Sequence, residues 1–182
     1  SELEDLLREV KELIDRLIDD SRRLVKTAEE LIREAIKRSE DLLEEVKRLI
    51  DRVTEMVERG ELDEDRLREL ERRIAELIKR SKELSDELRR RIEKIIEDSK
   101  RRTEEALERI RRKIEELKKK RDDERVREVL ERIKRLLEEL KKRDEDSVRE
   151  IERLLEELKR RNDRVVDEIR KLLKELAERV KK

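Results

Sequence analysis

The sequence contains no cysteine, histidine, proline or aromatic residue, and its only glycine is Gly60. Without cysteine the chain forms no disulfide and no thiolate metal site, and without histidine it lacks the commonest metal ligand and general base. A phosphate-binding loop needs several glycines. No apolar run is long enough to span a bilayer, and no signal peptide is recognisable. From these absences we expect no enzymatic activity, no cofactor and no bound metal.

The charges are abundant but balanced, with 55 basic and 55 acidic residues among 182. A nucleic-acid-binding protein normally carries an excess of positive charge, and a helix that lies on a membrane usually has aromatic anchors and a cationic face. We therefore expect neither nucleic acid nor a membrane as a partner. A chain that is 60% charged could be disordered. Its apolar residues, however, are Leu, Ile and Val at helical spacing among strong helix formers, which predicts long packed helices.

Pairs of neighbouring apolar residues recur at a constant 18-residue interval in three parts of the chain. Because 18 residues make about five whole helical turns, this repeat returns to the same helix face without drift. A heptad repeat would instead impose a left-handed supercoil. The repeat therefore predicts straight helices. The pairs are Leu13–Ile14, Leu31–Ile32 and Leu49–Ile50; Leu77–Ile78 and Ile95–Ile96; and Leu136–Leu137, Leu154–Leu155 and Leu172–Leu173.

Two turns are predicted. At the first, Gly60 is placed to end a helix in the left-handed conformation, and Asp63 is placed to cap the next helix. Leu62 and Leu67 have the spacing of a hydrophobic staple around that cap. Only charge marks the second turn, where the basic residues 118–121 precede Asp122, Asp123 and Glu124, with Asp122 as the expected cap.

These turns define three helices that cover about residues 2–59, 63–119 and 123–181. Short connections force neighbouring helices to run in opposite directions. We therefore predict an all-α fold, a straight (untwisted) antiparallel up-down-up three-helix bundle. Its helices of about 57 residues would be about 85 Å long, and residues 1–182 would form a single elongated domain.

Polar residues interrupt the apolar stripes at the same 18-residue interval. If the chain reverses near residues 60 and 121, these residues assemble into two layers that each draw on all three helices. One layer contains Ser21, Ser99, Thr103 and Asp144, and the other contains Ser39, Ser81, Ser85 and Asn162.

The layers have a functional and a structural interpretation. One carboxylate among hydroxyls is a poor metal shell, and no general base is paired with a nucleophile. The structural interpretation is that the polar groups satisfy one another in an apolar core and specify register at some cost in stability. Serines that bond back to their own helix would explain the serines alone, but not Asp144 and Asn162.

Residues 136–143 (LLEELKKR) and 154–161 (LLEELKRR) resemble the output of computational protein design. The whole chain resembles the parametrically designed helical bundles, specifically the untwisted antiparallel three-helix type with an 18-residue repeat. The resemblance implies a hyperstable monomer made to test bundle geometry. It also implies no natural substrate, partner or location, and soluble recombinant expression in the cytoplasm.

Two alternatives remain. The chain could be a designed interaction module, a switch-type bundle that presents or releases a helix to a partner. Its signature would be a weak stripe on one helix or a flexible linker, and the sequence shows neither. The chain could also turn only at Gly60, so that residues 61–182 form one continuous helix that dimerises.

Overall fold

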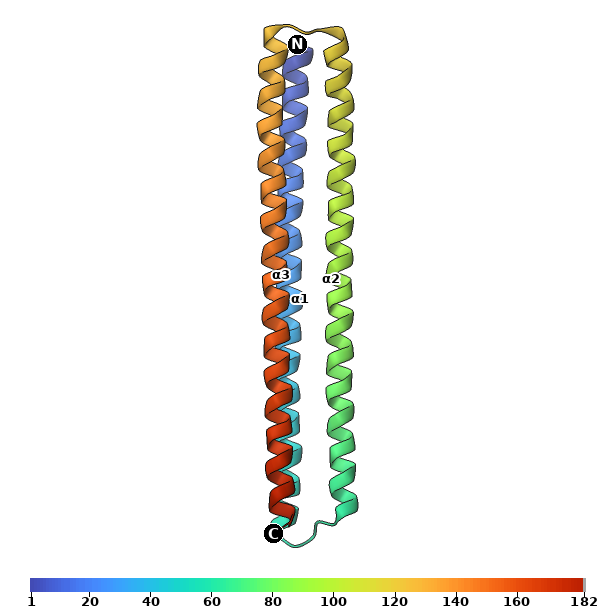
Figure 1. The fold of residues 1–182 in the computed structure, drawn as a ribbon, viewed down its shortest axis with the longest axis vertical. Helices are drawn as coiled ribbons and strands as arrows, with labels where there is room; N and C mark the ends of the chain where they lie inside the picture. Colours follow the sequence, from blue (N-terminus) through green and yellow to red (C-terminus); the bar gives the residue numbers. More distant parts are fainter. Residues whose placement is uncertain (182) are drawn as a thin grey trace. The chain divides into compact units, whose positions relative to one another are not determined.

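The computed structural model describes residues 1–181, which form three long α-helices (Figure 1). These are α1 (Glu2–Glu58), α2 (Glu64–Lys120) and α3 (Glu124–Lys181), and the described residues contain no strand. The helices pack as a bundle, so the predicted all-α three-helix fold is confirmed. The helix ends expected from the sequence lie within one residue of these bounds.

The contacts between helices group the chain into two compact units. Unit 1 contains Ser1–Glu29 and Arg91–Arg153, and unit 2 contains Glu30–Arg90 together with the chain from Leu154 to the end of α3. Each unit therefore holds one segment of every helix. Unit 1 includes the turn between α2 and α3, and unit 2 includes the turn between α1 and α2. A single elongated domain over residues 1–182 stays a prediction.

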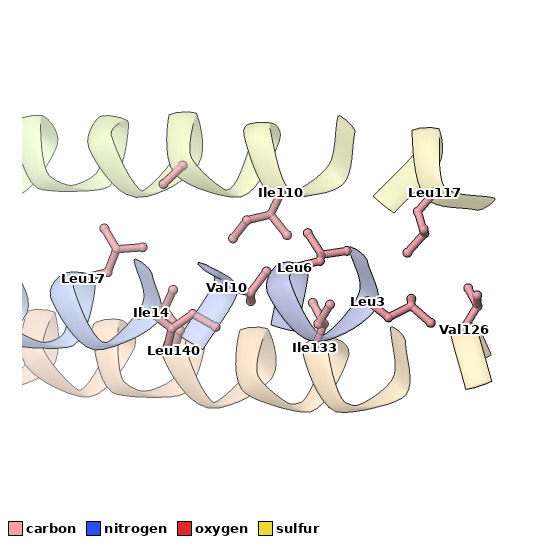
Figure 2. Packing of buried hydrophobic residues seen from close by; sticks show 11 residues of the cluster. Leu3, Leu6, Val10, Ile14, Leu17, Ile110, Leu117, Val126, Ile133 and Leu140 are labelled. Atoms are coloured by element: carbon pink, nitrogen blue, oxygen red, sulfur yellow. The ribbon is translucent and has the colours of Figure 1, made fainter. Parts of the chain in front are cut away.

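The core of unit 1 is formed by aliphatic side chains from all three helices. On α1 they recur every three or four residues, the spacing that places side chains on one face of a helix. Figure 2 shows Leu6 and Val10 of α1 packed with Ile110 of α2 and Ile133 of α3. Val10 and Ile133 are almost completely buried, at 1% and 0% exposure.

The core of unit 2 is built in the same way. Val46 of α1, Ile74 of α2 and Ile169 of α3 each have 0% exposure, so every helix supplies a fully buried side chain. Burial of one such aliphatic side chain stabilises the fold by about 1.5–3 kcal/mol. Repeated along each stripe, this burial is what holds the helix segments together.

Ion pairs on the surface record how α1 and α3 are aligned within each unit. In unit 1, Arg125 Nη2 lies 3.3 Å from Glu4 Oε1. In unit 2, Arg161 Nη1 lies 3.9 Å from Glu40 Oε1, and Lys47 Nζ lies 3.6 Å from Glu168 Oε1. Each α3 residue is numbered 121 higher than its α1 partner. In unit 2, where the two pairs lie seven residues apart on each helix, residue numbers therefore rise in the same direction along the α1 and α3 segments.

The first turn ends α1 through its backbone. Gly60 has a φ of 69°, its N–H donates to the Val57 carbonyl at 3.0 Å, and the N–H of Glu61 donates to the Met56 carbonyl at 3.0 Å. These two bonds are those of a Schellman motif. Asp63 Oδ1 then accepts a hydrogen bond of 2.8 Å from the Arg66 N–H, which satisfies one free donor at the start of α2.

The second turn differs from the prediction, because Asp123 and not Asp122 caps α3. Asp123 Oδ1 accepts a hydrogen bond of 3.0 Å from the Val126 N–H, and the Asp123 carbonyl accepts one from the Arg127 N–H. Asp122 lies one residue too early for this geometry, and its carboxylate accepts a bond from the Arg127 guanidinium instead.

The exposed surface carries oppositely charged side chains one helical turn apart. Arg143 with Glu139 and Arg161 with Glu157 are examples at 3.1 Å, each an i,i+4 pair. Such exposed pairs contribute little individually. Within residues 1–181, no helix has an apolar stretch long enough to cross a bilayer.

Candidate functional sites in two polar layers

Ser39, Ser81, Ser85 and Asn162 form one polar layer in unit 2, the amide layer. The Ser39 hydroxyl donates to Asn162 Oδ1 at 2.5 Å, and Asn162 Nδ2 donates to Ser85 Oγ at 2.9 Å. Ser39 is buried at 3% exposure, whereas Asn162 and Ser85 are half-buried. The amide of Asn162 in α3 therefore joins α1 to α2 through side chains alone.

An open cavity of about 530 Å³ adjoins the amide layer in unit 2, and Ser81 lines it together with Ser39, Ser85 and Asn162. All four residues predicted for this layer thus meet at one place. Except for Ser39 and Leu42, the lining residues come from α2 and α3. The cavity therefore follows the contact between those two helices.

The second layer lies in unit 1 and is called the carboxylate layer. Its predicted members, Ser21, Ser99, Thr103 and Asp144, all line one open cavity of about 600 Å³. Ser21 is buried at 5% exposure, and the other three are half-buried. The three helices thus bring together the residues that the 18-residue interval singled out.

Ser147 is a fifth member of the carboxylate layer, and it was not predicted. The Ser21 hydroxyl and the Ser147 hydroxyl lie 2.9 Å apart, and Ser147 lines the same cavity. The repeat contained the signal, because Ser147 stands one repeat after Val129 and one repeat before Val165, which are apolar core residues. A serine in a column of valines is a polar interruption like the others.

Asp144 is the only ionisable member of the two layers. Burial raises the pKa of its carboxyl above the ordinary value of 3.8, and the nearby Ser21 hydroxyl partly opposes this by hydrogen bonding to the carboxylate. Burial weighs more because removal of water disfavours the charged form. None of the ion pairs among the described residues includes Asp144. The half-buried carboxylate is therefore stabilised by the Ser21 hydroxyl and not by a cation.

The arrangement offers little catalytic chemistry. A serine acts as a nucleophile when a base close to neutral pKa removes its proton, and the carboxylate layer pairs its serines with a carboxyl only. Among residues 1–181, no group of three or more Asp, Glu, His or Cys side chains is arranged to hold a metal ion. Also within that range, every buried side-chain nitrogen or oxygen has a hydrogen-bond partner. Such satisfied groups are typical of a structural polar layer.

Comparison with known proteins identifies no family for this chain. No family model matches the sequence, and no curated protein matches it. Among solved structures the chain is similar to a computationally designed three helix bundle, with 20% sequence identity and a TM-score of 0.47. The match covers 99% of this chain and 88% of the other. At this level of similarity nothing about function follows, and the three-helix fold rests on the helices and contacts described above.

Proposed function

We propose that the chain is a de novo designed structural scaffold, a straight antiparallel up-down-up bundle that is a very stable monomer without biochemical activity. The observation that supports this most is the hydrogen-bonded chain from Ser39 through Asn162 to Ser85. Such a network is satisfied only when three helices bring polar positions of their repeats to the same level, so it contributes to specificity of packing.

The alignment of α1 with α3 supports the up-down-up path. Ion pairs in both units have the same sequence offset of 121, so α3 follows α1 in the same direction after one reversal through α2. The constant offset also suits straight helices with one repeat. The 18-residue spacing also supports straight helices, because it corresponds to a whole number of helical turns and imposes no supercoil.

The regularity of the polar interruptions supports a designed origin. Ser21 and Ser39 sit between Leu3 and Val57 at 18-residue steps on α1, and Asp144 and Asn162 sit between Val126 and Val180 on α3. In each column the two end members are apolar and the two inner members are polar. A plan applied equally to both helices explains this pattern.

Light scattering combined with small-angle X-ray scattering tests the proposal. The expected result is a monomer of 22.5 kDa with a maximum dimension near 85 Å, the length of about 57 helical residues. A dimer with a maximum dimension near 180 Å would overturn it, because that is about the length of one continuous helix over residues 61–182. The free chain should also keep its helical circular dichroism signal beyond about 5 M guanidinium chloride.

A second function, a bundle that releases one helix to a partner, is favoured by features of α2. This helix supplies fewer buried apolar side chains than α1, and its Leu84 is 46% exposed. In each unit, moreover, an open cavity lies along the contact of α2 with α3. Amide hydrogen exchange distinguishes the two functions. A releasable α2 would exchange as one unit and faster than α1 and α3, whereas a scaffold protects the centres of all three helices alike.

A further inference from the structure

The two polar layers differ in charge at one matched position. Asp144 and Asn162 stand one repeat apart on α3, and each lines a cavity with one serine of α1 and two hydroxyl residues of α2. Aspartate and asparagine have nearly the same shape, so the main chemical difference at this position is a negative charge. Unit 2 therefore presents an uncharged amide at the position that carries the carboxyl in unit 1, with Val165 in place of Ser147.

The cavity of unit 1 has the size and composition of a small-molecule site. Its volume of about 600 Å³ lies within the range of about 300–1,000 Å³ that is usual for ligand pockets. Its wall combines aliphatic side chains with four hydroxyl residues and the half-buried carboxyl of Asp144, and exposed charged side chains complete it. The aliphatic lining residues are Leu24, Ile96, Leu107, Leu137, Leu140 and Val148.

None of the other charged side chains around this cavity forms an ion pair with Asp144. They are all exposed, and they comprise five cations (Lys100, Arg111, Lys134, Lys141 and Arg149) and three acids (Glu104, Glu138 and Glu145). Exposed side chains of both signs remain hydrated and largely screen one another. Asp144 alone is half-buried, and no ion pair engages it. A cation that reached it would meet an unpaired charge with part of its water already removed.

We propose that the cavity of unit 1 binds an organic ammonium ion with a compact apolar body. The ammonium group lies against the Asp144 carboxylate and donates its remaining N–H groups to the hydroxyls of Ser99 and Thr103. The hydrocarbon body covers aliphatic wall residues such as Leu107 and Leu137. The cavity of unit 2, with Asn162 in place of the carboxylate, lacks this preference for a cation.

The physical reason is that the ligand supplies a positive charge next to Asp144, which has no cationic partner within the protein. A charge-assisted hydrogen bond in a partly dry site is worth more than one at an exposed surface, and contact of the hydrocarbon with leucines adds apolar burial. A neutral ligand of the same shape gains only the second contribution. The cavity should therefore bind a primary ammonium ion more tightly than the corresponding alcohol, because only the former is charged.

Nuclear magnetic resonance of the chain with labelled Leu, Ile and Val methyl groups tests this directly. The probe is cyclohexylammonium chloride, and cyclohexanol is its neutral counterpart. We expect saturable shifts of methyl groups in the unit 1 cavity, such as Leu107 and Val148, and about tenfold weaker binding of the alcohol. Methyl groups that line the other cavity, such as Ile78 and Leu158, should shift much less.

Matched variants complete the test. Asp144→Asn should weaken binding of the amine about tenfold, and Asn162→Asp should create a comparable site in unit 2. Glu138→Gln removes a rim charge of the same sign and should change affinity less than about twofold. Circular dichroism confirms that each variant is folded. Equal binding of amine and alcohol, equal binding by Asp144→Asn, or no saturable shift in the wild type would each overturn the proposal and leave the scaffold intact.

Discussion

The side-chain amide of Asn162 is shared by two partners, and the closer is Ser39, whose hydroxyl oxygen lies 2.5 Å from Asn162 Oδ1. Ser39 is on α1 and is buried at 3% exposure. The pair is 123 residues apart in sequence. Two polar atoms so distant in the chain meet only when α1 and α3 are aligned to within a whole 18-residue repeat.

Replacement of Ser39 by alanine should therefore lower the free energy of unfolding by about 1–3 kcal/mol, because Asn162 Oδ1 loses its buried donor. Guanidinium denaturation followed by circular dichroism measures the change. Thr27→Ala is the control, since Thr27 is an exposed hydroxyl on the same helix. It should leave stability unchanged or slightly higher, because alanine is the better helix former. Equal effects of the two variants would contradict a structural role for the amide layer.

Replacement of the carboxylate layer by apolar residues should have the opposite effect. The residues found at the same stripe positions elsewhere suggest Ser21→Leu, Ser99→Leu, Thr103→Leu and Asp144→Val. The fourfold variant should keep the fold and denature at a higher guanidinium concentration, because well-packed hydrophobic groups often stabilise more than buried polar ones. Light scattering checks its oligomeric state. If the variant unfolds or forms another oligomer, the polar residues of this layer are required for the topology of the bundle.

Asp144 should make stability depend on pH in the direction opposite to most carboxylates. Burial raises the pKa of its carboxyl in the folded state above 3.8, so between these two pKa values the folded chain binds more protons than the unfolded chain. Stability from this group is greatest below 3.8 and falls as pH rises through the folded pKa. Denaturation of wild type and Asp144→Asn across acidic pH measures it. The wild type should gain relative to the variant as pH falls, and a flat difference would contradict the raised pKa.

The cap of α3 gives a comparison between adjacent aspartates. Asp123→Ala should lower the denaturation midpoint, because the Val126 N–H loses its acceptor, whereas Asp122→Ala should have little effect. The pKa of Asp123 is lowered chiefly by that backbone hydrogen bond and by the one from Arg121. Its stabilisation is thus present above the ordinary pKa and is lost as pH falls through the lowered one. Similar midpoints for the two variants would show that Asp123 is not the cap.

Substitution of Gly60 should destabilise the chain, because other residues adopt its left-handed backbone conformation less readily. Its φ is 69°, and a Cβ built there would meet no atom within 4 Å. Gly60→Ala should therefore destabilise the chain by about 1–2 kcal/mol through the left-handed conformation alone. Gly60→Asn should lose less, because asparagine adopts that conformation more readily. Thermal denaturation in a fixed guanidinium concentration compares them, and equal loss for both would point to a steric cause instead.

Periodicity was enough to predict the helices and all members of the polar layers except Ser147. Ser21 and Asp144 could be placed together because each interrupts an apolar stripe and the turns align them. Ser147 was missed because Val148 beside it already continued the stripe. The signal for Ser147 lies in the residues 18 positions before and after it, which are both core valines, and not in its immediate neighbours.

The second turn shows what local sequence does not determine. Asp122 and Asp123 have the same capping chemistry, and both precede a helix-forming segment. In the structure Asp123 accepts the capping bond from the Val126 N–H, whereas Asp122 accepts a bond from the Arg127 side chain. The cavities could not be predicted from the sequence either. Their size depends on the distance between α2 and α3 and on the space that small serine side chains leave unfilled.

The 18-residue spacing also creates a competitor for the correct structure. If α1 slid by one full repeat along α3, its apolar stripe would again face an apolar stripe, and Ser21 would take the place of Ser39 beside Asn162. The hydrophobic surface alone distinguishes poorly between these alignments. Residues 59–63 and 121–123, which are too few to span five helical turns, make the slid arrangement unreachable within one chain. The shortness of the turns therefore selects the register, and longer linkers would expose the chain to misaligned folding.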